Sequence, residues 1–255
     1  MSLLQLALTA LAGFAAGAVN ALAGGGTLIS FPVLMAMGIP AVTANATNTV
    51  ALCPGYLGAV LAQRGDFQGQ RSRLKLLLPI AVGGGLLGGV LLLRTGEHAF
   101  SELVPWLILL ACMLLAAQER LRAVLVARGA ANARLGSTPL WLLPLVAVTA
   151  VYSGYFGAGV GVMVLAVLGL ALPDTLPRLN ALKQALALSA NGAAAIWFAV
   201  STPVNWRAAA VLAASALLGG ACGGRLARQL SPTLLRRAVV LLGIAIAVSY
   251  LMRAR

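Results

Sequence analysis

No charged side chain precedes Arg64, and this long uncharged start constrains the fold more than any other feature of the sequence. Across the chain, 61% of residues are hydrophobic and only 9% are charged, whereas an ordinary soluble domain carries roughly 25% charged residues. Several apolar stretches approach or exceed the roughly 17–25 residues that a membrane-spanning helix needs. The sequence therefore predicts an all-α, polytopic integral membrane protein and excludes a single soluble domain.

The net charge of +13 does not indicate nucleic-acid binding. The 18 Lys and Arg residues stand mostly between apolar stretches, where they act as topology signals, and no basic patch with interleaved aromatic residues is present. The amino-terminal stretch lacks the basic start of a signal peptide, so we expect no cleavage there. Cys53, Cys112 and Cys222 stand singly and are expected to be small buried residues.

Gly, Pro and charged residues divide the apolar sequence into five segments in each half. The expected segments are 3–21, 24–38, 42–62, 74–94, 101–118, 139–156, 158–172, 178–200, 207–225 and 234–252. Residues 1–118 would form a first membrane repeat and residues 139–255 a second. Residues 119–138, which are rich in Arg, Ala and Gly, would be a polar cytoplasmic linker between them.

The two halves resemble copies of each other. A glycine run interrupts the first apolar stretch of each half, at residues 24–26 and 157–159, and asparagines follow about twenty residues later. The fourth and ninth segments share a second pattern of overlapping GxxxG pairs, which lets helix backbones approach closely in lipid. Its members are Gly84, Gly85, Gly88, Gly89, Gly219, Gly220, Gly223 and Gly224.

The positions of the basic residues predict how the copies are oriented. If each glycine-broken opening returns the chain to its starting side, 14 of the 18 Lys and Arg residues lie on one face of the membrane. An odd number of crossings in each repeat then follows from the positive-inside rule, and the repeats are inverted relative to each other. We expect both termini outside the cytoplasm. The alternative is eight transmembrane helices arranged as 4+4.

Polar residues beside the glycine runs are the candidate substrate-binding residues. Glycine breaks inside an apolar segment are tolerated where they line a protected cavity, and amides at a new helix start can hold an anion. Turns without a ligand, asparagines that cap or bridge helices, and a lysine that reaches the interface are the alternatives. The candidates are Gly24, Gly25, Gly26, Thr27, Asn45 and Asn48 in the first half and Gly157, Gly159, Asn180 and Lys183 in the second.

The sequence contains no pattern that is typical of catalysis or metal binding. Its five acidic residues lie at or near loops, and its one histidine, His98, lies beside Glu97 in a short loop. A carboxylate-coupled antiporter, a metal site and a catalytic triad are therefore disfavoured. No cofactor and no catalytic residue are expected.

The first motif, Gly24 to Pro32 with its continuation through Gly38-Ile-Pro40 and Ala44 to Val50, resembles the signature of the TauE/SafE sulfite exporter family. The stretches from Gly154 to Gly161 and from Leu179 to Lys183 are similar to that family's second motif. The resemblance implies a bacterial inner-membrane permease that exports a small anion such as sulfite or an organosulfonate, with about eight helices in the usual description.

Three functions are compatible with the sequence. Secondary transport of a small anion through the lipid bilayer is the leading one, and the chain is expected not to be an enzyme. The alternative is a non-transporting membrane subunit or a membrane enzyme. Assembly into a homo-oligomer is also left open, as are the identity of the anion and the direction of its movement.

Overall fold

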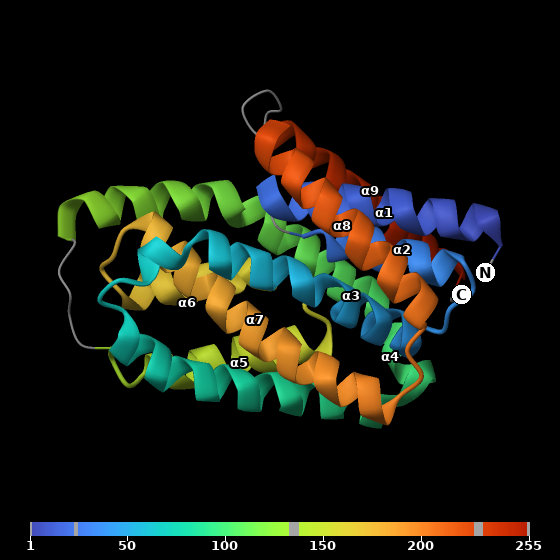
Figure 1. The fold of residues 1–255 in the computed structure, drawn as a ribbon, viewed down its shortest axis with the longest axis horizontal. Coiled ribbons are helices and arrows are strands. Elements are labelled where there is room, and N and C mark those ends of the chain that lie inside the picture. The colour runs from blue at the N-terminus through green and yellow to red at the C-terminus, as the bar shows by residue number, and fades with distance from the viewer. Residues whose placement is uncertain (1, 23–24, 133–137, 227–231, 254–255) are drawn as a thin grey trace.

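The computed structural model describes residues 2–22, 25–132, 138–226 and 232–253, and its elements are helices. The helices are α1 (Leu3–Leu22), α2 (Thr27–Ala36), α3 (Ala41–Ala62), α4 (Arg71–Asn132), α5 (Leu142–Tyr155), α6 (Val160–Ala171), α7 (Leu176–Ser201), α8 (Trp206–Leu226) and α9 (Pro232–Arg253), with the short 3-10 helix η1 (Arg64–Phe67) between α3 and α4. Most of them run along the long axis of the molecule (Figure 1). The expected all-helical class is confirmed for the described residues.

Helix α4 contains a sharp break at Gly96, which divides it into residues 71–95 and 97–132. Gly96 has φ 76° and ψ 169°, a conformation open to glycine but strained for other residues. The chain reverses there, at the end of the molecule where both termini lie (Figure 1). With this break, each apolar segment expected from the sequence coincides with one helix or with one part of α4.

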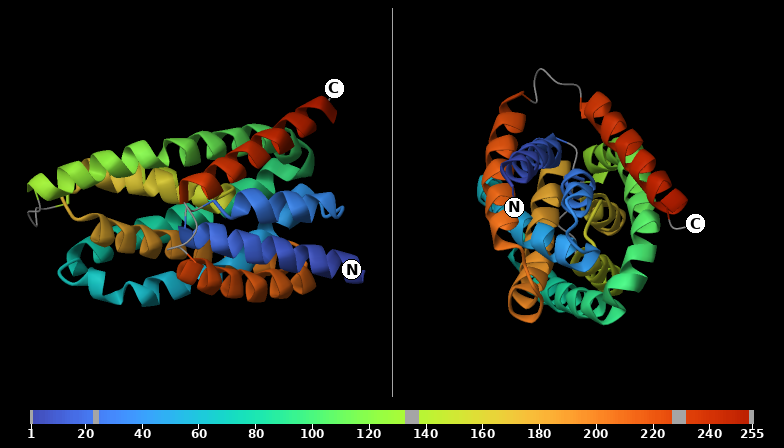
Figure 2. Two further views of the ribbon diagram at one scale, coloured as in Figure 1. Left: turned by 90° about the horizontal axis from the view of Figure 1, so that it is seen from above. Right: turned by 90° about the vertical axis from the view of Figure 1, so that its right-hand side faces the viewer.

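The opening of each half is a broken hairpin. Helix α1 runs from the end that carries the termini toward the middle of the molecule, and α2 returns from there (Figures 1 and 2). Helices α5 and α6 do the same from the opposite end (Figure 1). At 10 and 12 residues, α2 and α6 are about 15–18 Å long, which is too short to span a hydrocarbon core of about 30 Å.

Glycines bring two pairs of helices into close contact. Gly17 of α1 lies against the backbone of Ala216 in α8, and Gly219 of α8 lies against the backbone of Phe14 in α1. In the same way Gly88 of α4 lies against Val151 of α5, and Gly154 of α5 against Gly85 of α4. In each case a Cβ atom would collide with backbone, so the expected packing role is confirmed for Gly85, Gly88 and Gly219.

The chain is helical through much of the region expected to be a linker. Helix α4 continues past residue 118 to Asn132. The Ala, Leu and Arg residues of this stretch are strong helix formers, and it contains no proline, since the next one after residue 118 is Pro139. The helical extension also carries Glu119, which forms an ion pair of 2.8 Å with Arg236 of α9.

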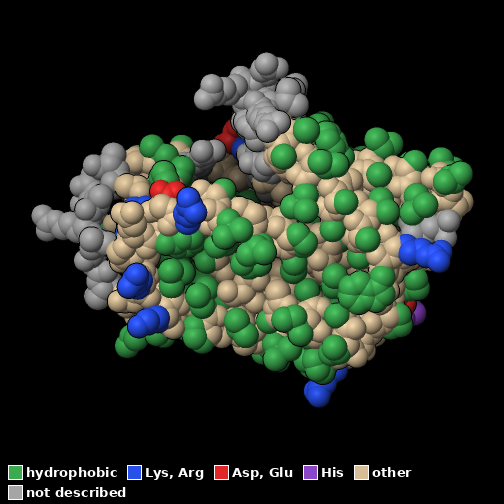
Figure 3. Space-filling model, viewed as in Figure 1, with side chains coloured by type: hydrophobic (Ala, Val, Ile, Leu, Met, Phe, Trp, Pro, Cys, Tyr) green, Lys and Arg blue, Asp and Glu red, His purple; other side chains and the backbone are tan. Residues whose placement is uncertain are grey.

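The surface of the bundle is that of a protein in lipid. Large hydrophobic side chains are exposed along the helices, including Leu4, Trp106, Val148, Ile196 and Leu241. On the face seen in Figure 3, several Lys and Arg side chains gather toward the left-hand end of the long axis. Within the part of the chain that the structure describes, three stretches are long and apolar enough to cross a membrane, by length and composition: Leu3–Asn20, Arg71–Ala127 across the Gly96 break, and Leu176–Ser201.

Candidate functional site

The two helix breaks depend on glycines that adopt positive φ. Gly25, between α1 and α2, has φ 104°, and Gly157 and Gly159, between α5 and α6, have φ 76° and 72°. Residues with a Cβ atom rarely adopt these angles, so the glycine runs determine where each hairpin breaks. Gly24 was also a candidate, and it lies outside the described residues.

Both breaks pack against the same turn of α4. A Cβ atom on Gly25 would lie 3.2 Å from Leu115, and one on Gly159 would lie 3.3 Å from the backbone of Ala111. Ala111 and Leu115 are four residues apart, which is about one helical turn, and both are fully buried. The structure therefore brings candidate residues from the two halves together inside the bundle.

Asn48 forms hydrogen bonds with the polar residues of α2, and together these side chains make a polar wall beside the first break. Its side-chain oxygen lies 2.6 Å from the Ser30 hydroxyl, which donates to it, and its Nδ2 donates to the Thr27 hydroxyl at 3.4 Å. All three side chains are buried. At the break itself, the Gly26 amide donates to Oδ1 of Asn20 at 2.8 Å. The Ser30 hydroxyl also lies 3.2 Å from the carbonyl oxygen of Gly26, so the candidates Gly26, Thr27 and Asn48 are joined in one hydrogen-bonded cluster.

Ser30 and Asn20 belong to this wall but were not among the candidates. Both lie in the motif that contains the glycine run, and each is a polar residue in an otherwise apolar stretch. Their polarity among apolar neighbours is the sequence feature that could have identified them as site residues. Their partners could not be read from the sequence, because Ser30 and Asn48 are 18 residues apart.

Asn45 connects the first half to the second. Its Nδ2 donates to the carbonyl oxygen of Tyr155 at 3.0 Å, which satisfies a carbonyl at the end of α5. Asn45 is completely buried, and its Oδ1 has no hydrogen-bond partner. An unpaired buried acceptor is costly, so a ligand that donates a hydrogen bond would be stabilised there.

The second break has its own buried asparagine. Asn191 of α7 donates to the Ser153 hydroxyl at 2.8 Å and to the Ala187 carbonyl at 2.9 Å. Its Oδ1 lies against Gly157, where a Cβ atom would be 3.4 Å away. Asn191 was not among the candidate residues, although it is an isolated amide in a stretch rich in Ala.

Lys183 and Asn180 lie on α7 with different neighbours. The side chain of Lys183 runs beside Gly161 in the first turn of α6, with Nζ 3.9 Å from the position of a Cβ there. Asn180 instead donates to Oε1 of Gln63, at the end of α3, at 2.7 Å. Lys183 is therefore placed near the second break, whereas Asn180 forms a bridge between α7 and α3.

Aromatic rings pack against the two breaks. Phe31 of α2 lies edge-on to Phe156, between α5 and α6, with ring centroids 5.3 Å apart. Phe100, just after the Gly96 bend of α4, contacts both rings and Tyr155. Phe100 thus connects the start of the second part of α4 to the rings beside the two breaks.

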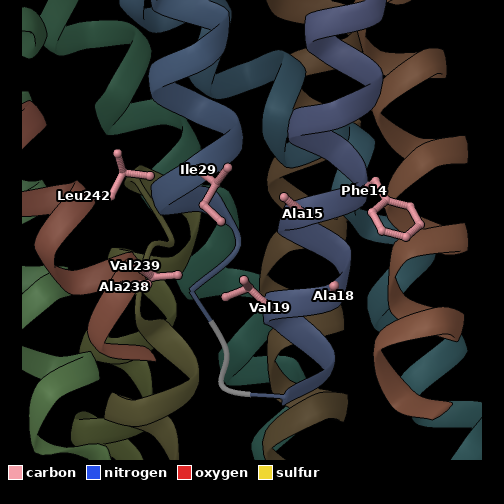
Figure 4. A pocket seen from close by; sticks show the side chains of 8 residues that line it. All are labelled: Phe14, Ala15, Ala18, Val19, Ile29, Ala238, Val239 and Leu242. Carbon is pink, nitrogen blue, oxygen red and sulfur yellow. The ribbon is translucent and has the colours of Figure 1, made fainter. Parts of the chain in front are cut away.

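A surface cavity of about 350 Å³ is lined by α1, α2 and α9 and is apolar (Figure 4). Its lining residues are Phe14, Ala15, Ala18, Val19, Ile29, Ala238, Val239 and Leu242. It offers no polar side chain to an anion, so it is separate from the candidate site. Among the described residues there is also no cluster of His, Cys, Asp and Glu that could hold a metal ion.

The fold and the site define a membrane-embedded helical protein in which two broken hairpins meet inside the bundle. Residues 9–250 match the family described as "Sulfite exporter TauE/SafE", and the chain belongs to that family. The resemblance seen in the two motifs is thereby confirmed.

Similar proteins carry matching descriptions. A "Probable membrane transporter protein" of Haemophilus influenzae is 29% identical over 93% of this chain and 91% of its own length. A "Probable membrane transporter protein ORF9" of Sinorhizobium is 26% identical over 96% and 92%, and "Probable membrane transporter protein YfcA" of Escherichia coli is 24% identical over 89% and 82%. No solved structure matches the chain.

Proposed function

We propose that this chain is a secondary transporter that exports a small oxyanion, such as sulfite or an organosulfonate, across the bacterial cytoplasmic membrane. The observation that carries the proposal is the meeting of Gly25 and Gly159 on one turn of α4, inside a membrane-embedded bundle. Broken helices that meet in this way are typical of transporter binding sites. The name of the family and the names of the relatives support the same function.

Alternating access between two inverted repeats is the mechanism that we propose. Helix α1 packs on α8 as α5 packs on the first part of α4, and α2 contacts α9 as α6 contacts the second part of α4. Exchanging the halves converts each of these four contacts into another of the four, and it exchanges α3 with α7, which are in contact with each other. Helices α1 and α5 run in opposite directions (Figure 1), as inverted repeats require.

The chemistry of the two walls suits a small oxyanion. The Thr27 and Ser30 hydroxyls and the amides of Asn45, Asn48 and Asn191 are neutral groups, which bind an anion without trapping it as several fixed charges would. Lys183, beside the start of α6, supplies one positive charge. The unpaired Oδ1 of Asn45 would accept a hydrogen bond from a protonated oxyanion such as hydrogen sulfite. In this proposal the substrate brings its own proton and no cofactor takes part.

Flux measurements in proteoliposomes test the proposal. We expect saturable sulfite movement with the wild-type chain and a loss of at least about tenfold in Asn48→Ala, because both Ser30 and Thr27 lose their partner. Ser72→Ala, a change on the exposed start of α4, is the matched control and should keep the wild-type rate. A panel of sulfite, sulfate, thiosulfate and methanesulfonate would identify the anion.

A non-transporting membrane subunit or a membrane enzyme is the competing function. If no anion of the panel crosses the membrane and none raises the thermal stability of the purified protein beyond the effect of chloride, that function is favoured and transport is rejected.

A further inference from the structure

A cluster of charged side chains lies where α4 and α7 begin, at the end of the molecule opposite the termini (Figure 1). Arg73 and Arg178 occupy the first turns of these two helices, which belong to different halves. The starts of the helices are in contact, because Nε2 of Gln70 donates to the carbonyl oxygen of Arg178 at 3.1 Å. In the sequence, these arginines stand out only as topology signals.

Asp174 links the two arginines. Its Oδ2 accepts from Nη1 of Arg73 at 2.5 Å, and its Oδ1 accepts from Nε of Arg178 at 2.7 Å and from the backbone amide of Thr175 at 2.8 Å. The exposed fractions are 5% for Arg73, 7% for Asp174 and 23% for Arg178. One carboxylate is therefore shared by two guanidinium groups in a place with little access to solvent.

The carboxylate of Asp174 neither neutralises both arginines nor accepts all of their hydrogen bonds. The described ion pairs give neither arginine a second carboxylate, so one positive charge is left uncompensated. Nη2 of Arg73 and Nη2 of Arg178 are both buried and have no hydrogen-bond partner. Neither helix has an acidic residue in its first turn, where the positive end of the helix dipole adds to the arginine charges.

We propose that Arg73 and Arg178 hold a small oxyanion through their Nη2 groups, in an anion site separate from the two glycine breaks. A bound oxyanion supplies the missing negative charge and the missing acceptors, and guanidinium groups suit oxyanions because their N–H groups match the spacing of the oxygens. The binding itself does not depend on transport. Its role rests on the proposed function: on the basic, cytoplasmic side, the site would collect the anion before export.

Anion-dependent thermal unfolding of the purified full-length chain tests the site, with sulfate as the probe and chloride at equal ionic strength as the reference. In Arg73→Gln we expect the sulfate concentration for half-maximal stabilisation to rise at least about tenfold, because a charge-assisted hydrogen bond is lost. Arg71→Gln removes an exposed arginine from the same helical turn and should leave that concentration unchanged.

Asp174→Asn separates an anion site from a purely structural ion pair. Removing the competing carboxylate leaves both guanidinium groups without a counter-charge, so we expect about tenfold tighter sulfate binding even though the protein without sulfate is less stable. A structural ion pair predicts the loss of stability with no gain in sulfate response. A measurable sulfate stabilisation that is equal in wild type, Arg73→Gln and Arg71→Gln, or that shows no gain in Asp174→Asn, would overturn the proposal.

The phosphate of a lipid headgroup has the same oxyanion chemistry as a free anion. A short-chain phosphatidylglycerol that stabilises the wild type but not Arg73→Gln, where sulfate has no effect on either, would assign the site to lipid. A sulfate response that depends on Arg73 in a protein without sulfite flux would keep the site and reject transport. Normal sulfite flux with a sulfate response that does not depend on Arg73 would keep transport and reject the arginine site.

Discussion

At the scale of single residues, the proposed site contains buried amides whose hydrogen-bond partners lie far away in the chain. Asn45 and Asn48 are three residues apart on α3, yet Asn48 contacts α2 and Asn45 contacts the end of α5. The spacing predicts a shared helix face, and the structure adds that this face is positioned between the two broken hairpins. Helix α3 therefore connects the two walls of the proposed site.

Replacement of Lys183 tests the charge in the proposed central site. We expect Lys183→Gln to weaken anion binding about tenfold, since a charge-assisted hydrogen bond becomes a neutral one. Lys75 is the only other lysine in the chain and is exposed at the start of α4, so Lys75→Gln is the matched control. Concentration-dependent flux in proteoliposomes provides the measurement, and equal half-saturation in both variants would exclude this role for Lys183.

At the scale of the helices, the position of α3 depends on a cap from another element. Pro40, which precedes α3, has no side-chain hydrogen bond to the helix. The carboxylate of Glu97, just after the Gly96 bend, accepts instead from the backbone amides of Ala41 and Val42, the latter at 2.9 Å. This contact ties α3, with its two asparagines, to the bend in α4.

Loss of this cap should destabilise the protein. We expect Glu97→Ala to lower the free energy of unfolding by about 1 kcal/mol, as for the loss of other helix N-caps. Glu102→Ala, which removes an exposed acid on the same helix, should change it little. Thermal unfolding in detergent compares the two variants, and equal stability would show that the cap contributes nothing.

The close contact between α4 and α5 is the second feature at this scale. In Gly88→Ala the new Cβ would collide with the carbonyl oxygen of Val151, and we expect a loss of about 1–3 kcal/mol from overpacking. Gly83, on the same helix, has no neighbour within 4 Å of a Cβ, so Gly83→Ala should be neutral or slightly stabilising. Unfolding measurements that gave equal losses for both variants would refute this account of the contact.

At the scale of the whole molecule, the arrangement of charges and chain ends defines an orientation. Both described ends of the chain lie at one end of the long axis, and η1 and the starts of α4 and α7 lie at the other (Figures 1 and 2). The basic residues Arg64, Arg71, Arg73 and Arg178 belong to these three elements. By the positive-inside rule, the end with the termini should face away from the cytoplasm.

Cysteine labelling in intact cells tests this orientation. In a background where Cys53, Cys112 and Cys222 are replaced by alanine, Ser2→Cys and Ala254→Cys should both react with a membrane-impermeant thiol reagent. Ser72→Cys, at the start of α4, should react only after the cells are broken. Protection of position 2 or position 254 in intact cells would overturn the proposed topology.

The sequence by itself determined the membrane class, the order of the helical segments and the places where the helices break. These features depend on local physics: apolar length decides whether a segment suits lipid, and glycine allows the positive φ of Gly25, Gly157 and Gly159. The continuation of α4 to Asn132 was not predicted from the sequence. The charged residues after residue 118 indicate a surface linker, but such residues also favour a helix.

Only the tertiary structure decided which side chains meet. The contacts of Asn45 with Tyr155, of Asn180 with Gln63 and of Arg73 with Asp174 join residues more than a hundred positions apart. No periodicity in the sequence specifies such pairs, because they depend on how closely glycines let the helices approach and on which polar groups packing leaves to be satisfied. The glycines marked where the uncharged chain breaks, and packing brought both breaks to the same turn of α4.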